Sequence, residues 1–178
     1  MKRSMGLLVL LGCVLVGGCQ AVAVGGTGQT EGTRVTAAGE PEPCELMDAG
    51  QRARLGLGNG EAVPDAPISG AALCGWFAAD TSADSYQGGV LPSNYRLVDA
   101  KKNYASSREL EVAGHPAVVA PLFESMTNET CIVLTELKDG RLVYMSFWAG
   151  RPAGATAEVS CRRATSAAEM VVQTMGSR

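Results

Sequence analysis

Cys131-Ile132-Val133-Leu134-Thr135-Glu136-Leu137 and Leu142-Val143-Tyr144-Met145-Ser146-Phe147-Trp148-Ala149 are the two stretches that decide the fold of this chain. Both are apolar and rich in β-branched or aromatic side chains, which predicts two strands. Lys138-Asp139-Gly140-Arg141 lies between them. An Asp-Gly pair between apolar runs indicates a β-hairpin, in which both central residues take a positive φ. We therefore expect a hairpin within an antiparallel sheet.

The rest of the chain supplies further strands and two helices to that sheet. An Ala-rich helix is expected after Cys161, and its Ser166 and Glu169 resemble a capping box, so it would start a turn later than that cysteine. The Gly-rich stretches Leu57–Gly70 and Thr81–Ser93 are interpreted as loops. The remaining expected elements are a helix from Pro43 to Arg54 and strands at Leu73–Ala78, Tyr95–Val98 and Ala117–Ala120. The fold class is therefore α+β, an antiparallel sheet of four to five strands with the N- and C-terminal helices packed on one face.

Four cysteines of the C-terminal part predict two disulfides. The separation of Cys44 from Cys74 equals that of Cys131 from Cys161. This equal spacing favours the pairs Cys44–Cys74 and Cys131–Cys161, each of which would join the start of a helix to a strand. Disulfides are expected because the cysteines of an exported chain usually oxidise. The alternative pairs Cys44 with Cys161 and Cys74 with Cys131. No Cys-x-x-Cys is present, so a metal or redox role is disfavoured.

The N-terminus has the pattern of a lipoprotein signal peptide. Lys2 and Arg3 precede the apolar run Leu7–Val16, which is shorter than the about 20 residues that span a bilayer. Gly17-Gly18-Cys19 then matches the site where a diacylglycerol is attached to a cysteine thiol and the chain is cut before it. Cys13 is a competing site with a shorter apolar run. We expect a signal peptide over 1–18, a lipidated tether over 19–41 and one globular domain over 42–178.

Charge and composition indicate where the mature chain resides and what it contacts. The chain has 15 basic and 18 acidic residues, and removal of Lys2 and Arg3 leaves 13 against 18, a net charge of −5. Such a balance disfavours nucleic acid and anionic headgroups. The tether is rich in Gly, Thr, Ala and Glu and lacks aromatic residues, as flexible segments do. We expect contact with the outer face of the cell membrane through the lipid on Cys19 alone.

The sequence lacks a recognisable catalytic constellation. His115 is the only histidine and lies in a Gly-His-Pro turn, so no second histidine can join it as a base or metal ligand. No Gly-x-Ser-x-Gly occurs. The carboxylates Glu109 and Glu111, or Asp80 and Asp84, are more typical of solvated surfaces than of a site. We therefore expect no enzyme activity, no metal and no cofactor.

Aromatic residues on the second hairpin strand are the candidate binding residues. Tyr144 and Trp148 share one face of that strand, opposite Val143, Met145 and Phe147. An apolar sheet face that helices leave uncovered usually marks a binding site. The alternative is that Tyr144 and Trp148 belong to the core, because the domain has few other large side chains. The stretch Thr81–Ser93 is a second candidate contact.

Several short motifs together resemble a domain-of-unknown-function family of actinobacterial envelope lipoproteins. Besides Cys161, they are Pro43-Cys44-Glu45-Leu46, Leu55-Gly56-Leu57, Cys74-Gly75-Trp76, Gly114-His115-Pro116-Ala117 and Cys131-Ile132-Val133-Leu134. The resemblance implies an outward-facing lipoprotein and carries over no catalytic residue. The leading hypothesis is a membrane-anchored module that binds a small ligand or an envelope protein. The alternatives are an accessory subunit of a transporter or sensor complex, and an envelope hydrolase with an unrecognised carboxylate pair.

Overall fold

The computed structural model describes residues 41–80, 82–121, 130–150 and 156–176. All of these described residues belong to one compact unit. The elements along the chain are the 3-10 helix η1 (Pro43–Glu45), α1 (Ala49–Leu55), β1 (Leu57–Ala62), β2 (Cys74–Ala78), β3 (Ser85–Val90), α2 (Leu97–Asn103), β4 (Arg108–Val112), β5 (His115–Pro121), β6 (Thr130–Glu136), β7 (Leu142–Trp148) and α3 (Ala157–Gly176).

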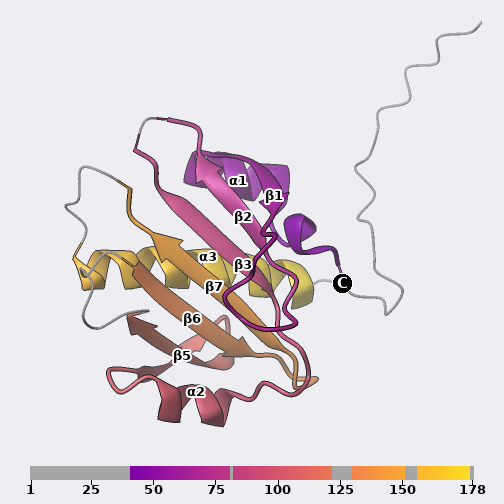
Figure 1. The fold of residues 1–178 in the computed structure, drawn as a ribbon, viewed down its shortest axis with the longest axis vertical. Helices are drawn as coiled ribbons and strands as arrows, with labels where there is room; N and C mark the ends of the chain where they lie inside the picture. Colours follow the sequence, from indigo (N-terminus) through magenta and orange to yellow (C-terminus); the bar gives the residue numbers. More distant parts are fainter. Residues whose placement is uncertain (1–40, 81, 122–129, 151–155, 177–178) are drawn as a thin grey trace, which may run out of the picture. The chain divides into compact units, whose positions relative to one another are not determined.

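The described strands form one antiparallel sheet in the order β1-β2-β3-β7-β6-β5-β4 (Figure 1). The predicted hairpin is β6–β7, and β7 pairs with β3 on its other side. The fold class α+β is confirmed, but the prediction of four to five strands is wrong because the sheet has seven.

Two missing strands lie in the glycine-rich stretches interpreted as loops. β1 falls within Leu57–Gly70, and β3 falls within Thr81–Ser93. Glycine in β3 allows close packing: a Cβ on Gly88 would lie 2.3 Å from the Met145 sulfur, and one on Gly89 would lie 2.4 Å from the Ala72 carbonyl oxygen. The third unpredicted strand, β4, lies at the edge of the sheet. Its side chains are mostly charged, which obscures the alternation of apolar and polar residues that would indicate a strand.

The predicted strand Tyr95–Val98 is wrong. Its second half is the start of helix α2, in which Leu97 and Ala100 are the buried residues. Two apolar residues three apart define only one turn of a helix, and a four-residue stretch with weak alternation matches a strand equally well.

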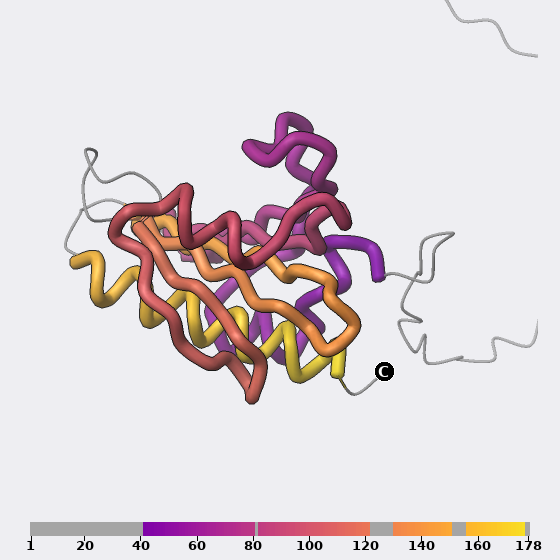
Figure 2. Tube along the Cα trace, turned by 90° about the horizontal axis from the view of Figure 1, so that it is seen from below, coloured from indigo at the N-terminus to yellow at the C-terminus, as the bar shows by residue number. Residues whose placement is uncertain are grey.

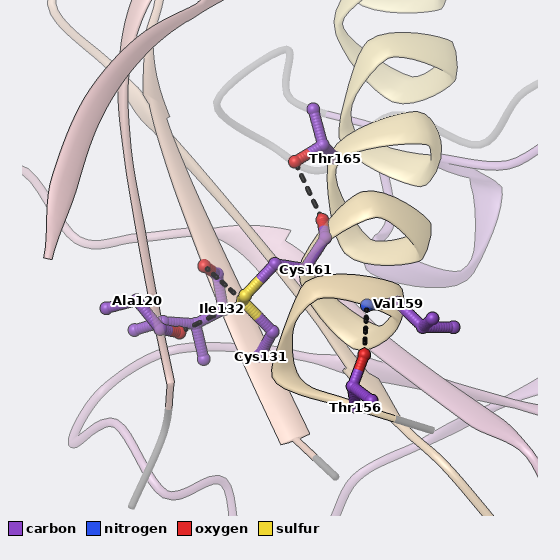
Figure 3. Close-up of a disulfide and its surroundings, with 7 residues drawn as sticks. All are labelled: Ala120, Cys131, Ile132, Thr156, Val159, Cys161 and Thr165. Atoms are coloured by element: carbon purple, nitrogen blue, oxygen red, sulfur yellow. Dashed lines mark hydrogen bonds between the residues drawn. A yellow bond between two sulfur atoms is a disulfide. The ribbon is translucent and has the colours of Figure 1, made fainter. Parts of the chain in front are cut away.

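Helix α3 begins earlier than its internal capping signal suggested. It starts at Ala157, so Cys161 and Ser166 both lie inside it. Thr156 supplies the cap instead, because its Oγ1 accepts a hydrogen bond from the Val159 N–H at 3.3 Å (Figure 3). The predicted apolar face is present: Ala164, Ala167, Ala168, Val171 and Val172 are all buried.

The N-terminal helix is split in two. η1 ends at Glu45, and α1 starts after Asp48, whose side chain accepts a hydrogen bond from the Gln51 N–H at 2.7 Å. The Gln51 side-chain oxygen in turn accepts a hydrogen bond from the Asp48 N–H, which completes a capping box. Gly56, at φ 68°, ends α1 in the left-handed conformation that glycine adopts readily.

Two disulfides attach helical segments to the sheet. Cys44 of η1 bonds to Cys74 of β2, and Cys131 of β6 bonds to Cys161 of α3 (Figure 3). This is the pairing that the equal spacing favours, and each bond spans a sequence separation of 30. Both bonds lie on the sheet face that carries α3.

Apolar side chains are buried on both faces of the sheet. On one face, α3 and the segment around η1 cover Trp76, Met145 and Phe147. On the other, α2 and the segment 63–73 cover a smaller cluster that includes Ile132 and Tyr144. Figure 2 shows α3 and the segment 63–73 on opposite sides of the strands. The face away from α3 is therefore only partly covered, and the candidate binding residues lie there.

Candidate functional site

The two predicted binding residues share a face of β7 but differ in exposure. Tyr144 is buried, with 2% of its surface exposed, whereas Trp148 is 56% exposed. Tyr144 belongs to the smaller apolar cluster, covered by α2 and the segment 63–73. The core interpretation thus holds for Tyr144, and the surface interpretation holds for Trp148.

Strand register places Trp148 in a row that crosses four strands. Trp148 lies opposite Ser85 of β3 on one side and Thr130 of β6 on the other. Ser85 in turn lies opposite Phe77 of β2, which is 52% exposed. Directly paired residues of an antiparallel sheet point to the same face. Phe77, Ser85, Trp148 and Thr130 therefore line one end of the face away from α3.

The next row inward is polar where it crosses β3 and β7. Gln87 of β3 lies opposite Ser146 of β7, and Gly75 of β2 lies opposite Gln87 on the other side. The Phe77 ring lies beside Gly75, where a Cβ would be 3.4 Å from it, an ordinary van der Waals contact. Small and polar side chains thus separate the exposed row from the buried Tyr144.

These residues line a groove of about 270 Å³, which we call the Trp148 groove. The segment after β1 forms its other wall. Its lining residues are Val63, Asp65, Pro67, Ser85, Gln87, Thr130, Tyr144, Ser146 and Trp148. Among these described lining residues, Asp65 is the one that is charged, and the remaining polar groups are neutral hydroxyls, an amide and an indole N–H.

Tyr144 connects the Trp148 groove to a second cavity. Burial raises the pKa of the Tyr144 hydroxyl, a hydrogen bond with the Ser146 side chain partly opposes this, and nearby Tyr104 adds to it. Burial also raises the pKa of Tyr104. Both hydroxyls therefore stay neutral at physiological pH and act as hydrogen-bonding groups rather than as charges.

The second cavity, of about 350 Å³, lies beside α2. Three tyrosines line it, and the Tyr95 hydroxyl donates a hydrogen bond to the Ser69 carbonyl oxygen at 3.3 Å. Its lining residues are Ile68, Leu91, Asn94, Tyr95, Arg96, Asp99, Ala100, Asn103, Tyr104, Leu134, Leu142 and Tyr144. Tyr144 is the residue that both cavities share.

A third cavity, of about 400 Å³, includes the acidic pair Asp80 and Asp84. Asp84 is already engaged: one carboxylate oxygen accepts from the Gly150 N–H at 2.9 Å, and the other pairs with Arg163. The Arg163 guanidinium also lies 5.1 Å from the centre of the Phe147 ring. These contacts fasten the start of β3 and the end of β7 to α3, which is a structural role.

The remaining candidate residues do not converge on a reactive centre. His115 begins β5, and its Nδ1 lies 3.3 Å from the Glu136 carbonyl oxygen. Glu109 pairs with Lys101 at 2.6 Å on the edge strand β4. Over the part of the chain that the structure describes, no cluster of three or more His, Cys, Asp or Glu side chains is placed to hold a metal ion.

Ser85 and Gln87 lie within Thr81–Ser93, the second candidate contact, but that stretch was expected to be a loop, so their place on a strand paired with β7 was not predicted. The available signal was the period of two in Ser85-Tyr86-Gln87-Gly88, in which Tyr86 and Gly88 are buried and the other two are half-buried. Cys19, the expected signal peptide over 1–18 and the expected tether up to residue 40 lie outside the described residues. Among the described helices, none combines the length and apolarity needed to cross a bilayer.

The fold and site define a small α+β domain with two disulfides and a ligand-sized groove on its less covered sheet face. The family described as "Protein of unknown function (DUF3558)" matches residues 14–174, and the chain therefore belongs to it. No curated protein and no solved structure is significantly similar to this chain.

Proposed function

We propose that this protein is an extracytoplasmic lipoprotein, held on the outer face of the cell membrane by a diacylglycerol on Cys19, that binds a ligand in the Trp148 groove without transforming it. The sequence Gly17-Gly18-Cys19 after a short apolar run supports the anchor. Two disulfides among the described residues agree with an oxidising compartment.

One observation carries the binding proposal: an exposed indole borders a groove of neutral polar groups. The Trp148 indole is 56% exposed and lines the groove, and binding pockets typically combine aromatic contact area with a few polar groups. The groove lies on the sheet face away from α3.

The anchor is tested by substituting each candidate cysteine in the expressing bacterium. Cys19→Ser should abolish incorporation of labelled fatty acid and release the protein from the membrane fraction. Cys13→Ser is the matched control and should remain labelled and membrane-bound. If Cys19→Ser still incorporates the labelled fatty acid and Cys13→Ser does not, the lipid is attached to Cys13 instead. If neither the wild type nor the Cys13→Ser control incorporates the label, the protein has no lipid anchor.

Binding is tested by native mass spectrometry of the full chain after incubation with a small-molecule extract of the envelope. Wild type should retain a non-covalent adduct that Trp148→Ala loses. Val98→Ala, which also truncates an apolar side chain that is 48% exposed, is the control and should keep the adduct. An adduct that survives Trp148→Ala would reject the Trp148 groove as its site.

An accessory subunit of a transporter or sensor complex is a second candidate, because Phe77 and Trp148 expose two large rings in one row. Buried aromatic anchors dominate protein interfaces. This function predicts co-purification with an integral membrane protein that the double variant Phe77→Ala/Trp148→Ala abolishes. Co-purification that persists in the double variant would exclude this row as the interface.

A further inference from the structure

The chemistry of the Trp148 groove restricts what it can bind, given that the proposed binding function is correct. The side chains of Ser85, Gln87 and Thr130 make no hydrogen bond to another described residue. Ser146 and Tyr144 add two hydroxyl groups deeper in the groove. Hydroxyls both donate and accept, and the Gln87 amide offers two donors and an acceptor, so the groove presents an array of neutral, bidirectional hydrogen-bonding groups.

Charge excludes one large class of ligand. Among the described residues that line the groove there is no Lys, Arg or His, and the one charged group is the Asp65 carboxylate. A phosphate, sulfate or carboxylate would therefore lose hydration without gaining a cationic partner, which is unfavourable. The cavity beside α2 differs in this respect, because Arg96 lines it.

Polarity excludes a second class. An acyl chain or other wholly apolar ligand would cover the Ser85, Gln87 and Thr130 side chains and leave them without partners. Each polar group buried without a partner carries an uncompensated desolvation penalty, which offsets the apolar contact with Trp148. The ligand that fits must carry many neutral hydrogen-bonding groups of its own.

Trp148 adds the requirement for a flat apolar surface on the same ligand. Its indole is 56% exposed, lies directly between Ser85 and Thr130 in the strand register, and presents an extended ring to the groove. A pyranose ring has hydroxyls at its rim and a patch of aliphatic C–H groups on its face, so it can stack on an indole while its rim hydroxyls pair with neighbouring side chains. Few other neutral ligands combine these two surfaces.

The size of the site agrees with this class. A volume of about 270 Å³ lies just below the range of about 300–1,000 Å³ for small-molecule sites, and suits one or two sugar rings. Phe77 lies in the same row as Trp148, two strand spacings or about 9.6 Å away. It offers a second exposed ring to a longer chain of sugars.

We propose that the Trp148 groove binds a neutral carbohydrate, with one sugar ring stacked on Trp148 and its hydroxyls paired with Ser85, Gln87, Thr130 and Ser146. The sugar is either a free oligosaccharide or a unit of an envelope glycan. The chemistry of both sources is the same, and the experiment separates them.

The test titrates the full chain in detergent with maltotriose, mannotriose and tri-N-acetylchitotriose, following tryptophan fluorescence and heat. At least one trisaccharide should bind with a Kd below about 1 mM and shift the emission. Trp148→Ala should weaken binding by about tenfold or more and Gln87→Ala by less, while Val98→Ala should leave it unchanged. Trp148→Phe keeps a stacking ring, so it should retain binding while losing the emission shift, because the buried Trp76 would then be the only tryptophan.

A matched panel decides between the outcomes. Sodium phosphate and decanoate should not compete with the trisaccharide. Pull-down on insoluble envelope polysaccharide, compared with the soluble sugars, identifies which source is preferred. If all three trisaccharides fail and the envelope-extract adduct still requires Trp148, the carbohydrate inference is overturned while the binding function stands. If neither requires Trp148, both are overturned. Circular dichroism of Trp148→Ala should match wild type, and if that variant misfolds, Gln87→Ala decides.

Discussion

Tyr144 and Trp148 show how surroundings decide the role of a side chain. They lie four residues apart on one strand and point to the same face, yet one is 2% exposed and the other 56%. The difference arises from what lies above them: Tyr144 is beneath α2 and the segment 63–73, while Trp148 is at the uncovered end of the face. Sequence could place both residues on one face, but segments distant in sequence determine the cover.

Ala113 occupies a backbone conformation that disfavours alanine. It joins β4 to β5 with Gly114 in a two-residue turn, and the φ values of the two residues are 50° and 79°. Asparagine tolerates this left-handed region better than alanine does. Ala113→Asn should therefore raise the free energy of unfolding by about 1 kcal/mol, measured by urea denaturation.

The control for this substitution is Ala105→Asn, at an exposed turn position outside the positive-φ residues. It should change the unfolding free energy by no more than about 0.5 kcal/mol. Equal effects at the two positions would show that the turn geometry does not govern the result.

At the scale of elements, prediction from the sequence succeeded where a signal was local. The β6–β7 hairpin and the apolar face of α3 follow from runs and spacings within one segment. Even there the turn differs in detail, because Gly140 has a positive φ and Asp139 does not. β1 and β3 could not be predicted, because their glycines are explained by side chains on neighbouring segments, such as Met145 against Gly88. Because β3 was expected to be a loop, the position of Ser85 and Gln87 on the wall of the Trp148 groove was not predicted either.

Gln51 is the polar link between α1 and α3. Its Nε2 donates to the Met170 carbonyl oxygen at 2.9 Å and to the Thr174 Oγ1 at 2.6 Å, and the residue is 5% exposed. Gln51→Ala removes these bonds and leaves a void between the helices. We expect a loss of about 1.5–3 kcal/mol in unfolding free energy. Gln87→Ala, which loses no hydrogen bond to a described residue, should cost less than about 0.5 kcal/mol; equal losses would refute the link.

The two disulfides test whether chain entropy or local packing dominates their stabilising effect. Both close loops of the same length, with a separation of 30 residues. The entropy model therefore assigns each about 3.5–4 kcal/mol. Cys131→Ala/Cys161→Ala and Cys44→Ala/Cys74→Ala should lose that amount equally in chemical denaturation. A clearly larger loss for the first pair would show that attachment of α3 to β6 adds native-state packing that the entropy model omits.

At the scale of the whole domain, the sheet separates two apolar clusters that have different roles. The cluster beneath α3 and η1 contains the largest buried ring, Trp76, and both disulfides. The cluster beneath α2 is smaller and ends in the Trp148 groove. One face thus provides stability, which leaves the other face free to keep polar groups and an exposed indole for binding.

Buried tyrosines on both faces predict how stability responds to alkaline pH. Burial raises the pKa of Tyr86, Tyr104 and Tyr144 above the ordinary value of 10.0. Below pH 10 these hydroxyls are protonated in both the folded and the unfolded state, so they cause no change in the unfolding free energy with pH there. As pH rises above 10 the unfolded chain loses its protons first, and each such tyrosine lowers the unfolding free energy by up to about 1.4 kcal/mol per pH unit until its folded-state pKa is reached.

Tyr144→Phe removes one of these groups while keeping its ring. The variant should lose less unfolding free energy than wild type between about pH 10 and 11.5, after the difference between the two proteins at pH 8 is subtracted. Denaturant titrations at each pH give the free energies, and ultraviolet absorbance of the phenolate shows which state has ionised. Parallel curves for the two proteins would mean that Tyr144 ionises as readily in the folded domain as in the unfolded chain. In that case the face under α2 admits water, and its cover is looser than the 2% exposure of Tyr144 implies.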